Sequence, residues 1–291
     1  MKSYNLVLAA FLFTSLAVLR GAEPASTTVA IRVEHDVDYL PKDRSEKADL
    51  YFPINATTSN PKPAVVIIHG GSFKHGDKAD AREQNIANTL AGGGFLAMSI
   101  NYKLMTDAKP DIWPRNLYDC KTAVRWLRKN ATRLNVDPNH IGAIGESAGG
   151  YLVVMLAVTG PESGLDPITP YGEYSCRIQA AVDMYAPIRM LTNRPLLGKS
   201  QAEAPELYRQ AKPITHLDKN NPPFLIIHGT ADKNVSPDHS KYFAEHLKLA
   251  GITHQFVLVE GAAHSFDLQP PQKDLRPIVL DFLNQHLRPT N

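Results

Sequence analysis

The segment HIGAIGESAGG, residues 140–150, decides the fold because it joins a strand-like run to a helix-like run through a glycine-flanked serine. The run His140–Ile144 predicts a buried strand, and the apolar run Ala148–Val158 predicts a helix. Between them, Ser147 is the central residue of the pattern Gly-x-Ser-x-Gly, in which small flanking residues permit a sharp turn. Such a turn holds the serine hydroxyl clear of the sheet, at a helix N-terminus that favours negative charge. Ser147 is therefore a candidate nucleophile.

Strand-like and helix-like segments alternate along the rest of the chain. This alternation is typical of an α/β fold with a mostly parallel sheet and helices on both faces. We find no internal repeat and no disordered linker, and we expect a single domain over residues 23–291. The expected strands are Thr28–Leu40, Ala48–Ile54, Ala64–Gly70, Phe95–Asn101, His140–Ile144, Ala180–Met184, Phe224–Ile227 and His254–Val259. The expected helices are Ala81–Ala91, Asn116–Leu134, Ala148–Val158, Pro237–Ala250 and Leu275–Leu287.

Two irregular segments interrupt the alternation, Gly160–Arg177 and Tyr185–Leu217. Ligands of open α/β sheets bind beyond the carboxyl ends of the strands, so both segments are candidates for a short cap at a pocket rim there, with plain surface loops as the alternative. The longer segment contains four prolines and one short, largely polar helical stretch, Ala204–Gln210. Because proline restricts the backbone, we expect a semi-rigid rim and no mobile hydrophobic lid.

An acid and a base for Ser147 follow later in the chain. A serine hydroxyl is a poor nucleophile without a base, and the expected order is serine, acid, histidine. Asp232 lies just past the expected strand Phe224–Ile227, and His264 follows the next expected strand. The carboxyl ends of parallel strands share one edge, so both residues fall at the edge that carries Ser147. His264 would take the Ser147 proton, and Asp232 would hold the imidazole in the right tautomer.

Several other polar and aromatic residues are open to more than one interpretation. His228 also stands at a strand end, and we interpret it as a structural histidine. Glu146 precedes Ser147 and is interpreted as a supporting group, with a substrate contact left open. Trp113 and Tyr185 are candidate substrate-binding residues, although such aromatics more often belong to the core. The acidic residues that compete with Asp232 are Asp183, Glu260 and Asp267.

The segment HGGSF, residues 69–73, directly follows a buried strand and predicts an oxyanion hole. Such a site needs backbone N–H groups that approach the substrate closely, and glycine permits that approach. The loop after this strand and the residue after the nucleophile are the usual donors. We therefore assign N–H donation to Gly71, Ser72 and Ala148, and we expect His69 to shape the loop.

Charge and cysteine content exclude other classes of protein. The 291 residues include 31 basic and 29 acidic residues, and removal of residues 1–22 leaves 29 of each. The remaining chain therefore has no excess of basic residues, and its charge gives no indication that it binds nucleic acid or anionic lipid. The histidines and carboxylates lack metal-ligand spacing, so we expect neither a metal nor a cofactor. Cys120 and Cys176 fit either two core thiols or one disulfide.

Residues 1–22 have the pattern of a secretory signal peptide. Lys2 precedes the apolar run Leu6–Leu19, and small residues follow around positions 21–25. The run is short for a membrane span, although an uncleaved anchor is the alternative. We expect a secreted or periplasmic protein without stable membrane association after cleavage, with the cleavage position within 21–25 left open.

Together these motifs resemble the α/β-hydrolase superfamily, in particular esterases and lipases with an HGG oxyanion loop. They are most similar to feruloyl esterase-like bacterial esterases. Ser72 departs from the third glycine of many relatives, and Lys103 replaces a common arginine. The resemblance runs in family order over most of residues 45–287 and is carried by HGGSFKHGDK (His69–Lys78), INYKL (Ile100–Leu104), DCKTAVRWLRKNA (Asp119–Ala131), DPNHIGAIGESAGG (Asp137–Gly150), PPFLIIHGTAD (Pro222–Asp232) and GAAHSF (Gly261–Phe266).

The three candidate catalytic residues and the resemblance together predict a serine esterase that works through an acyl-enzyme, and the N-terminal signal pattern predicts that it is secreted. Its implied substrates are short-chain or aryl esters of carbohydrates, acetyl or feruloyl. Other acyl hydrolases share this fold, so a peptidase, amidase or lactonase is an alternative. A non-catalytic binding protein of hydrolase fold is a further alternative, although such proteins usually lose a triad member. The expected partner of the chain is a small-molecule or oligosaccharide ester substrate, and we expect no nucleic acid partner.

Overall fold

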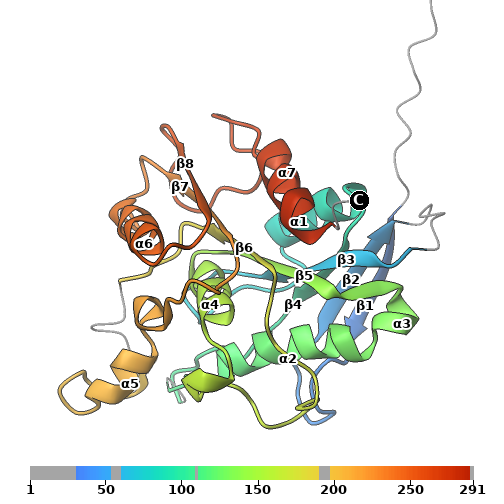
Figure 1. Cartoon of the computed structure of the whole chain (residues 1–291), viewed down its shortest axis with the longest axis horizontal. Coiled ribbons are helices and arrows are strands. Elements are labelled where there is room, and N and C mark those ends of the chain that lie inside the picture. The colour runs from blue at the N-terminus through green and yellow to red at the C-terminus, as the bar shows by residue number, and fades with distance from the viewer. Residues whose placement is uncertain (1–30, 54–59, 109–110, 190–196, 289–291) are drawn as a thin grey trace, which may run out of the picture.

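The computed structural model describes residues 31–53, 60–108, 111–189 and 197–288. Within them the chain forms an eight-stranded, mostly parallel sheet with helices on both faces (Figure 1). This is the α/β-hydrolase fold, and the expected fold class is confirmed. The predicted signal peptide, residues 1–22, lies outside the described residues.

The helices and strands follow the expected alternation. The strands are β1 (Ile31–Val37), β2 (Ala48–Pro53), β3 (Lys62–Ile68), β4 (Leu96–Ile100), β5 (Val136–Glu146), β6 (Ala180–Met184), β7 (Phe224–Gly229) and β8 (His254–Val259). The α-helices are α1 (Ala81–Gly92), α2 (Arg115–Lys129), α3 (Ala131–Leu134), α4 (Ala148–Val158), α5 (Pro205–Gln210), α6 (Asp238–Leu249) and α7 (Arg276–Leu287). Short 3-10 helices lie at η1 (Pro161–Ser163) and η4 (Pro213–His216).

The helix expected over Asn116–Leu134 is divided into α2 and α3. Asn130 separates them, and its side-chain amide donates a hydrogen bond to the Trp126 carbonyl at 2.9 Å. The same carbonyl also accepts the Asn130 backbone N–H at 3.0 Å, so the side chain adds a second local bond at the end of α2. Asn135 then ends α3 in the left-handed region, at φ 52°.

The order of the strands places a crevice at the centre of the sheet. That order is β1-β2-β4-β3-β5-β6-β7-β8, in which β1 and β2 are antiparallel to their neighbours and the other strands are parallel. The chain moves from β3 outward to β4 and then returns past β3 to β5. Its direction across the sheet therefore reverses between β3 and β5. Ligands of open α/β sheets bind beyond the carboxyl ends of the strands at this kind of reversal.

Helices cover the two faces of the sheet in separate layers, which explains the continuous apolar run of β3. Ala64, Val66 and Ile68 pack in the core cluster that includes α2, α4 and α6. The alternate residues Val65 and Ile67 pack in the other cluster, with α1 and α7 (Figure 1). Side chains of a strand alternate between its faces, so a strand covered on both sides needs apolar residues at every position.

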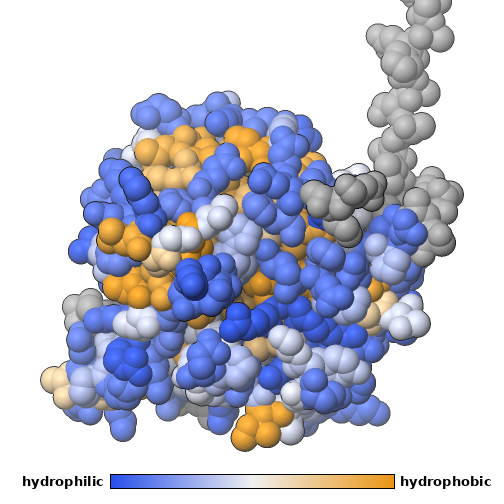
Figure 2. All heavy atoms as spheres, viewed as in Figure 1, coloured by the Kyte–Doolittle hydropathy of each residue, from blue (hydrophilic) through white to orange (hydrophobic). Residues whose placement is uncertain are grey.

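The surface is polar over most of the face drawn in Figure 2. The most exposed large apolar side chains among the described residues are Ile168, Leu249 and Leu258. In the same part of the chain, no helix has the length and apolar character that a bilayer crossing demands.

Candidate active site

The turn between β5 and α4 places Ser147 at the carboxyl edge of the sheet. Its backbone is strained, with φ 53° and ψ −117°, and its N–H donates to the Met184 carbonyl at 2.9 Å. A Cβ added to Gly149 would lie 1.9 Å from the Ile68 carbonyl oxygen, and one added to Gly145 would lie 2.7 Å from Gly149. The helix therefore approaches β3 and β5 too closely for any side chain at either glycine, which explains the Gly-x-Ser-x-Gly pattern.

The structure brings Ser147, His264 and Asp232 together in a hydrogen-bonded chain. His264 Nε2 lies 3.1 Å from Ser147 Oγ, and His264 Nδ1 lies 2.6 Å from Asp232 Oδ2. Asp232 follows β7 and His264 follows β8, so the parallel strands deliver both to the Ser147 edge. The Asp232 carboxylate accepts a hydrogen bond from His264 Nδ1, so it favours the tautomer with the proton on Nδ1. In that tautomer Nε2 is free to accept the serine proton.

Two backbone groups and a second histidine hold the Asp232 carboxylate. Asp232 Oδ1 accepts hydrogen bonds from the N–H groups of Asn234 and Val235, each at 2.9 Å. His228 Nε2 lies 2.9 Å from the Val235 carbonyl oxygen and 3.3 Å from Asp232 Oδ2. A carbonyl only accepts, so His228 Nε2 carries the hydrogen.

His228 is a buried, neutral support of the acid. Its Nδ1 lies 2.7 Å from Ser240 Oγ, so it accepts the hydroxyl proton in the tautomer that Val235 imposes. Burial lowers the pKa of His228, which keeps the ring uncharged at neutral pH. The sequence predicts a structural role for His228, but the spacing along the chain does not predict its contact with Asp232.

The loop after β3 has three consecutive residues in the left-handed region of backbone conformation. Gly71, Ser72 and Phe73 have φ values of 98°, 56° and 62°. A Cβ on Gly71 would lie 2.2 Å from the His75 carbonyl oxygen, so this position requires glycine. Gly71, Ser72 and Ala148 line the same cavity as Ser147, as their predicted role requires.

His69 shapes this loop from beneath and does not line the cavity. Its Nδ1 lies 2.8 Å from the Gly70 carbonyl oxygen, and its ring stacks on Tyr102 with centroids 4.4 Å apart. The Tyr102 hydroxyl donates to the His69 carbonyl at 2.8 Å. Burial lowers the pKa of His69, so the ring is a neutral structural element.

The cavity over Ser147 has a volume of about 260 Å³. More than half of the residues that line it are polar, and Phe73, Ala148, Pro187 and Val235 supply the apolar part of the wall. The lining residues are Gly71, Ser72, Phe73, Arg82, Ser147, Ala148, Pro187, Asn234, Val235, His264 and Ser265. Among the described residues of the insertion 185–217, only Pro187 lies in this wall. The insertion therefore contributes less to the rim of the pocket than the sequence predicts.

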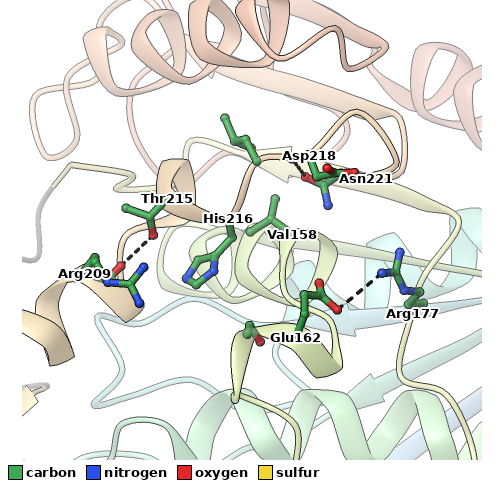
Figure 3. A pocket seen from close by; sticks show the side chains of 10 residues that line it. Val158, Glu162, Arg177, Arg209, Thr215, His216, Asp218 and Asn221 are labelled. Atoms are coloured by element: carbon green, nitrogen blue, oxygen red, sulfur yellow. Dashed lines mark hydrogen bonds and ion pairs between the residues drawn. The ribbon is translucent and has the colours of Figure 1, made fainter.

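A larger hollow of about 500 Å³ lies at the other end of α4 (Figure 3). Glu162 and Arg177 pair across it at 3.8 Å. The expectation that Gly160–Arg177 borders the Ser147 pocket is wrong, because α4 carries the chain from the carboxyl edge of the sheet to the amino edge. The segment then packs on α2, where the buried Lys121 ammonium pairs with Asp166.

The aromatic residues predicted to contact substrate lie in the core. Trp113 is buried and packs against Tyr151, with ring centroids 6.0 Å apart, and it is absent from the cavity wall. Tyr185 is fully buried, donates its hydroxyl to the Phe266 carbonyl, and meets the His264 ring edge-on. The prediction of a substrate contact is corrected for both residues. Tyr185 instead supports the base.

The buried thiols and carboxyl groups described elsewhere in the structure are core residues. Cys120 and Cys176 are both free and buried, so the structure contains two core thiols and no disulfide between them. Within the described ranges, no group of three or more histidine, cysteine or acidic side chains is arranged to hold a metal ion. Asp183, a competing acid, is buried in β6 and accepts the Ala186 N–H at 3.0 Å, away from His264.

A family model described as BD-FAE matches residues 48–247, which is more than half of the chain. The chain belongs to the BD-FAE family. The matched region of this BD-FAE protein begins with β2 and ends within α6. It therefore includes Ser147 and Asp232 and stops before His264.

Curated and solved relatives of this BD-FAE protein include esterases. Esterase LipC of Mycobacterium tuberculosis is 29% identical over 224 residues, covering 72% of this chain and 54% of LipC. The chain thus spans about half the length of that relative. A structure described as a truncated carbohydrate esterase from gut microbiota is 27% identical, with TM-score 0.78 over 90% of this chain and 98% of the other. Thermogutta terrifontis esterase 2 phosphorylated by paraoxon is 27% identical, with TM-score 0.69 over 92% and 98%.

Proposed function

We propose that this BD-FAE protein is a serine carboxylic-ester hydrolase that works through an acyl-enzyme. The observation that carries the proposal is the position of His264, whose two ring nitrogens lie within hydrogen-bond reach of Ser147 and Asp232. The cavity above Ser147 and the positive-φ loop at Gly71 and Ser72 support it. A solved relative is described as phosphorylated by paraoxon, a reagent that traps activated serines, which also supports the proposal.

Each step of the reaction uses a group already in place. His264 Nε2 takes the Ser147 proton as Oγ attacks the ester carbonyl. The N–H groups of Gly71, Ser72 and Ala148 stabilise the negative charge that develops on the carbonyl oxygen. His264 then protonates the leaving alcohol, and the acyl group stays on Ser147. Water attacks the acyl-enzyme by the reverse use of the same base, while Asp232 stabilises the imidazolium throughout.

We further propose short-chain or aryl esters of carbohydrates, acetyl or feruloyl, as substrates. A cavity of about 260 Å³ suits a small acyl group. The similarity to a carbohydrate esterase of gut microbiota favours a sugar in the alcohol part. Hydrolysis of p-nitrophenyl esters beside acetylated and feruloylated oligosaccharides tests this class. Preference for an amide or a lactone in the same screen would replace the ester proposal.

A serine-directed phosphonate tests the mechanism independently of substrate. The wild-type chain should be labelled to one equivalent at Ser147, and Ser147→Ala should take up no label. A folded wild-type chain that stays unlabelled and hydrolyses none of the esters would instead be a binding protein of hydrolase fold.

The chain is also proposed to be exported, to the periplasm or the medium. Lys2, the apolar run Leu6–Leu19 and the small residues that follow support this proposal. Expression of the full chain, followed by N-terminal sequencing of the exported fraction, tests it. A new N-terminus within positions 22–26 is expected, and an intact N-terminus in the membrane fraction would contradict cleavage.

A further inference from the structure

One charged side chain in the cavity wall has no role in the proposed mechanism. Arg82, from the start of α1, is the single Lys, Arg, Asp or Glu among the described residues that line the cavity. Its guanidinium pairs through Nη1 with Glu146 Oε1, and 28% of the side chain is exposed. Arginine has five N–H donors, so the pair with Glu146 leaves donors for a ligand.

A second carboxyl group behind Glu146 holds the ion pair in place. Glu83 is buried on α1 at 2% exposure and hydrogen-bonds to Glu146. Burial, and after it the neighbouring Glu146 carboxylate, raises the pKa of Glu83 to about 9. Glu83 therefore carries a proton at neutral pH. Since Oε1 is taken by Arg82, the buried and otherwise unpartnered Glu146 Oε2 is the acceptor that remains.

Glu146, which pairs with Arg82 and Glu83, is in contact with both the nucleophile turn and the oxyanion loop. Glu146 directly precedes Ser147, and a Cβ on Gly70 would lie 2.6 Å from Glu146 Oε2, so the carboxylate fits tightly under the oxyanion loop. Because Glu83 is protonated, it adds no charge beside the Arg82–Glu146 ion pair. Arg82 therefore presents oriented donors to the cavity with little net local charge.

The chemistry of an ester decides which part would meet these donors. A hydrocarbon acyl chain against Arg82 would strip water from the guanidinium without replacing its hydrogen bonds, which is unfavourable. The N–H groups of Gly71, Ser72 and Ala148 take the carbonyl oxygen. The acceptors that remain in an acetyl ester are the oxygens of its alcohol part. Because the Glu83–Glu146 pair offsets the positive charge, uncharged hydroxyls fit better than a carboxylate.

We propose that Arg82 is a specificity-determining residue that binds hydroxyl or ring oxygens of a sugar in the alcohol part of the ester, and that Glu146 and Glu83 are the positioning residues that hold it. This inference rests on the proposed esterase function. It adds a contact that selects sugar esters over alkyl esters with the same acyl group.

The test compares two acetyl esters that differ only in the alcohol. The measured quantity is the ratio of kcat/KM on an acetylated xylo-oligosaccharide to kcat/KM on ethyl acetate. Arg82→Met should lower this ratio by about tenfold or more, mainly through KM, since a lost hydrogen bond to a charged donor weakens binding by about that factor. Arg276→Met is the matched control, because Arg276 pairs with Asp274 in an exposed ion pair at the start of α7. It should leave the ratio unchanged.

Further variants separate binding from scaffold effects. Arg82→Lys keeps the charge and loses the planar fork, so it should also lower the ratio. Glu83→Ala should lower the ratio, and Glu83→Gln should restore it, because a glutamine amide can donate to Glu146 as the protonated acid does. Thermal unfolding of each variant confirms that it folds.

The outcomes distinguish this inference from the function on which it rests. An unchanged ratio in Arg82→Met and Arg82→Lys would overturn the inference, as would an equal loss on both esters. A change confined to discrimination between methyl ferulate and methyl cinnamate would also overturn it, by placing Arg82 on the acyl side. A wild-type chain that is not labelled by the phosphonate fails the proposed function itself.

Discussion

The rings of Tyr185 and His264 meet edge-on, with their centroids 4.8 Å apart. Tyr185 follows β6 and donates its hydroxyl to the Phe266 carbonyl, two residues beyond His264. One side chain thus fixes both the ring of the base and the loop that carries it. An aromatic residue that resembles a pocket residue in the sequence therefore acts from inside the core.

Two substitutions at Tyr185 separate these contacts. Tyr185→Phe keeps the ring and leaves the buried Phe266 carbonyl unpaired, so unfolding should become easier by about 1–3 kcal/mol while kcat changes little. Tyr185→Leu removes the edge contact with His264, which is worth about 0.5–1.5 kcal/mol, so kcat should fall by up to about tenfold at similar KM. Chemical denaturation and steady-state kinetics measure both effects. Equal kcat values in the two variants would contradict a role for the ring.

Ser147→Ala should abolish nearly all turnover in a folded protein. Loss of a triad member typically lowers kcat by about 10⁴–10⁶. Circular dichroism and thermal unfolding serve as the control for folding, and p-nitrophenyl acetate hydrolysis is the assay. A folded variant that keeps a tenth of the wild-type rate would end the assignment of Ser147 as nucleophile.

His228→Leu should lower kcat through Asp232, with little change in KM. The substitution leaves the Val235 carbonyl and the Ser240 hydroxyl without their buried partner, at a cost of about 1–3 kcal/mol of stability. If His228 acts through the acid, it should cost much less activity in an Asp232→Asn background. Additive losses in the double variant would show that His228 supports only the fold. His246→Gln, on α6, is a matched histidine control.

The buried Glu83 should make stability fall as pH rises. Its folded pKa of about 9 lies above the ordinary value of 4.5, so the folded chain keeps a proton that the unfolded chain releases. The contribution is therefore complete below the ordinary value and declines as pH rises toward about 9. Burial raises the pKa of Asp183 to about 7, which acts in the same direction at lower pH.

Glu83→Gln should flatten the decline in Tm between about pH 5 and pH 9, since glutamine does not titrate. The exposed Glu245, on α6, provides the control Glu245→Gln, which should leave the slope unchanged. Parallel Tm profiles for wild type and Glu83→Gln would show that Glu83 titrates alike in the folded and unfolded chains.

Local sequence patterns were sufficient to predict the strands and turns that carry the site residues. The run at β3 predicts a strand buried on both faces because adjacent residues face opposite helix layers. The chain order of Ser147, Asp232 and His264 places all three at one edge because parallel strands deliver their carboxyl ends there. No long-range information is needed for either inference.

The contacts that the sequence missed depend on distant segments. Arg82 and Glu83 are adjacent on α1, yet both meet Glu146, which follows them by more than sixty positions. Spacing along the chain carries no signal for such a pair. The wrong prediction for segment 160–177 has a different cause. The edge of the sheet at which this segment lies depends on the direction in which α4 crosses the sheet.

The described part of the insertion 185–217 favours short substrates and no interfacial activation. Only Pro187 from this part lines the cavity, and α5 is a six-residue helix that buries Tyr208 alone. A hydrophobic lid needs a longer amphipathic helix with a wide apolar face. With a volume of about 260 Å³, the cavity should accept acetate to butyrate esters and lose kcat/KM steeply beyond about eight carbons. Measurement of kcat/KM from acetate to palmitate esters, on both sides of the solubility limit, checks this expectation. Because no described helix is available to open over Ser147, the rate should show no jump when substrate forms micelles. A preference for palmitate with activation at the interface would mean that the insertion works as a mobile cover.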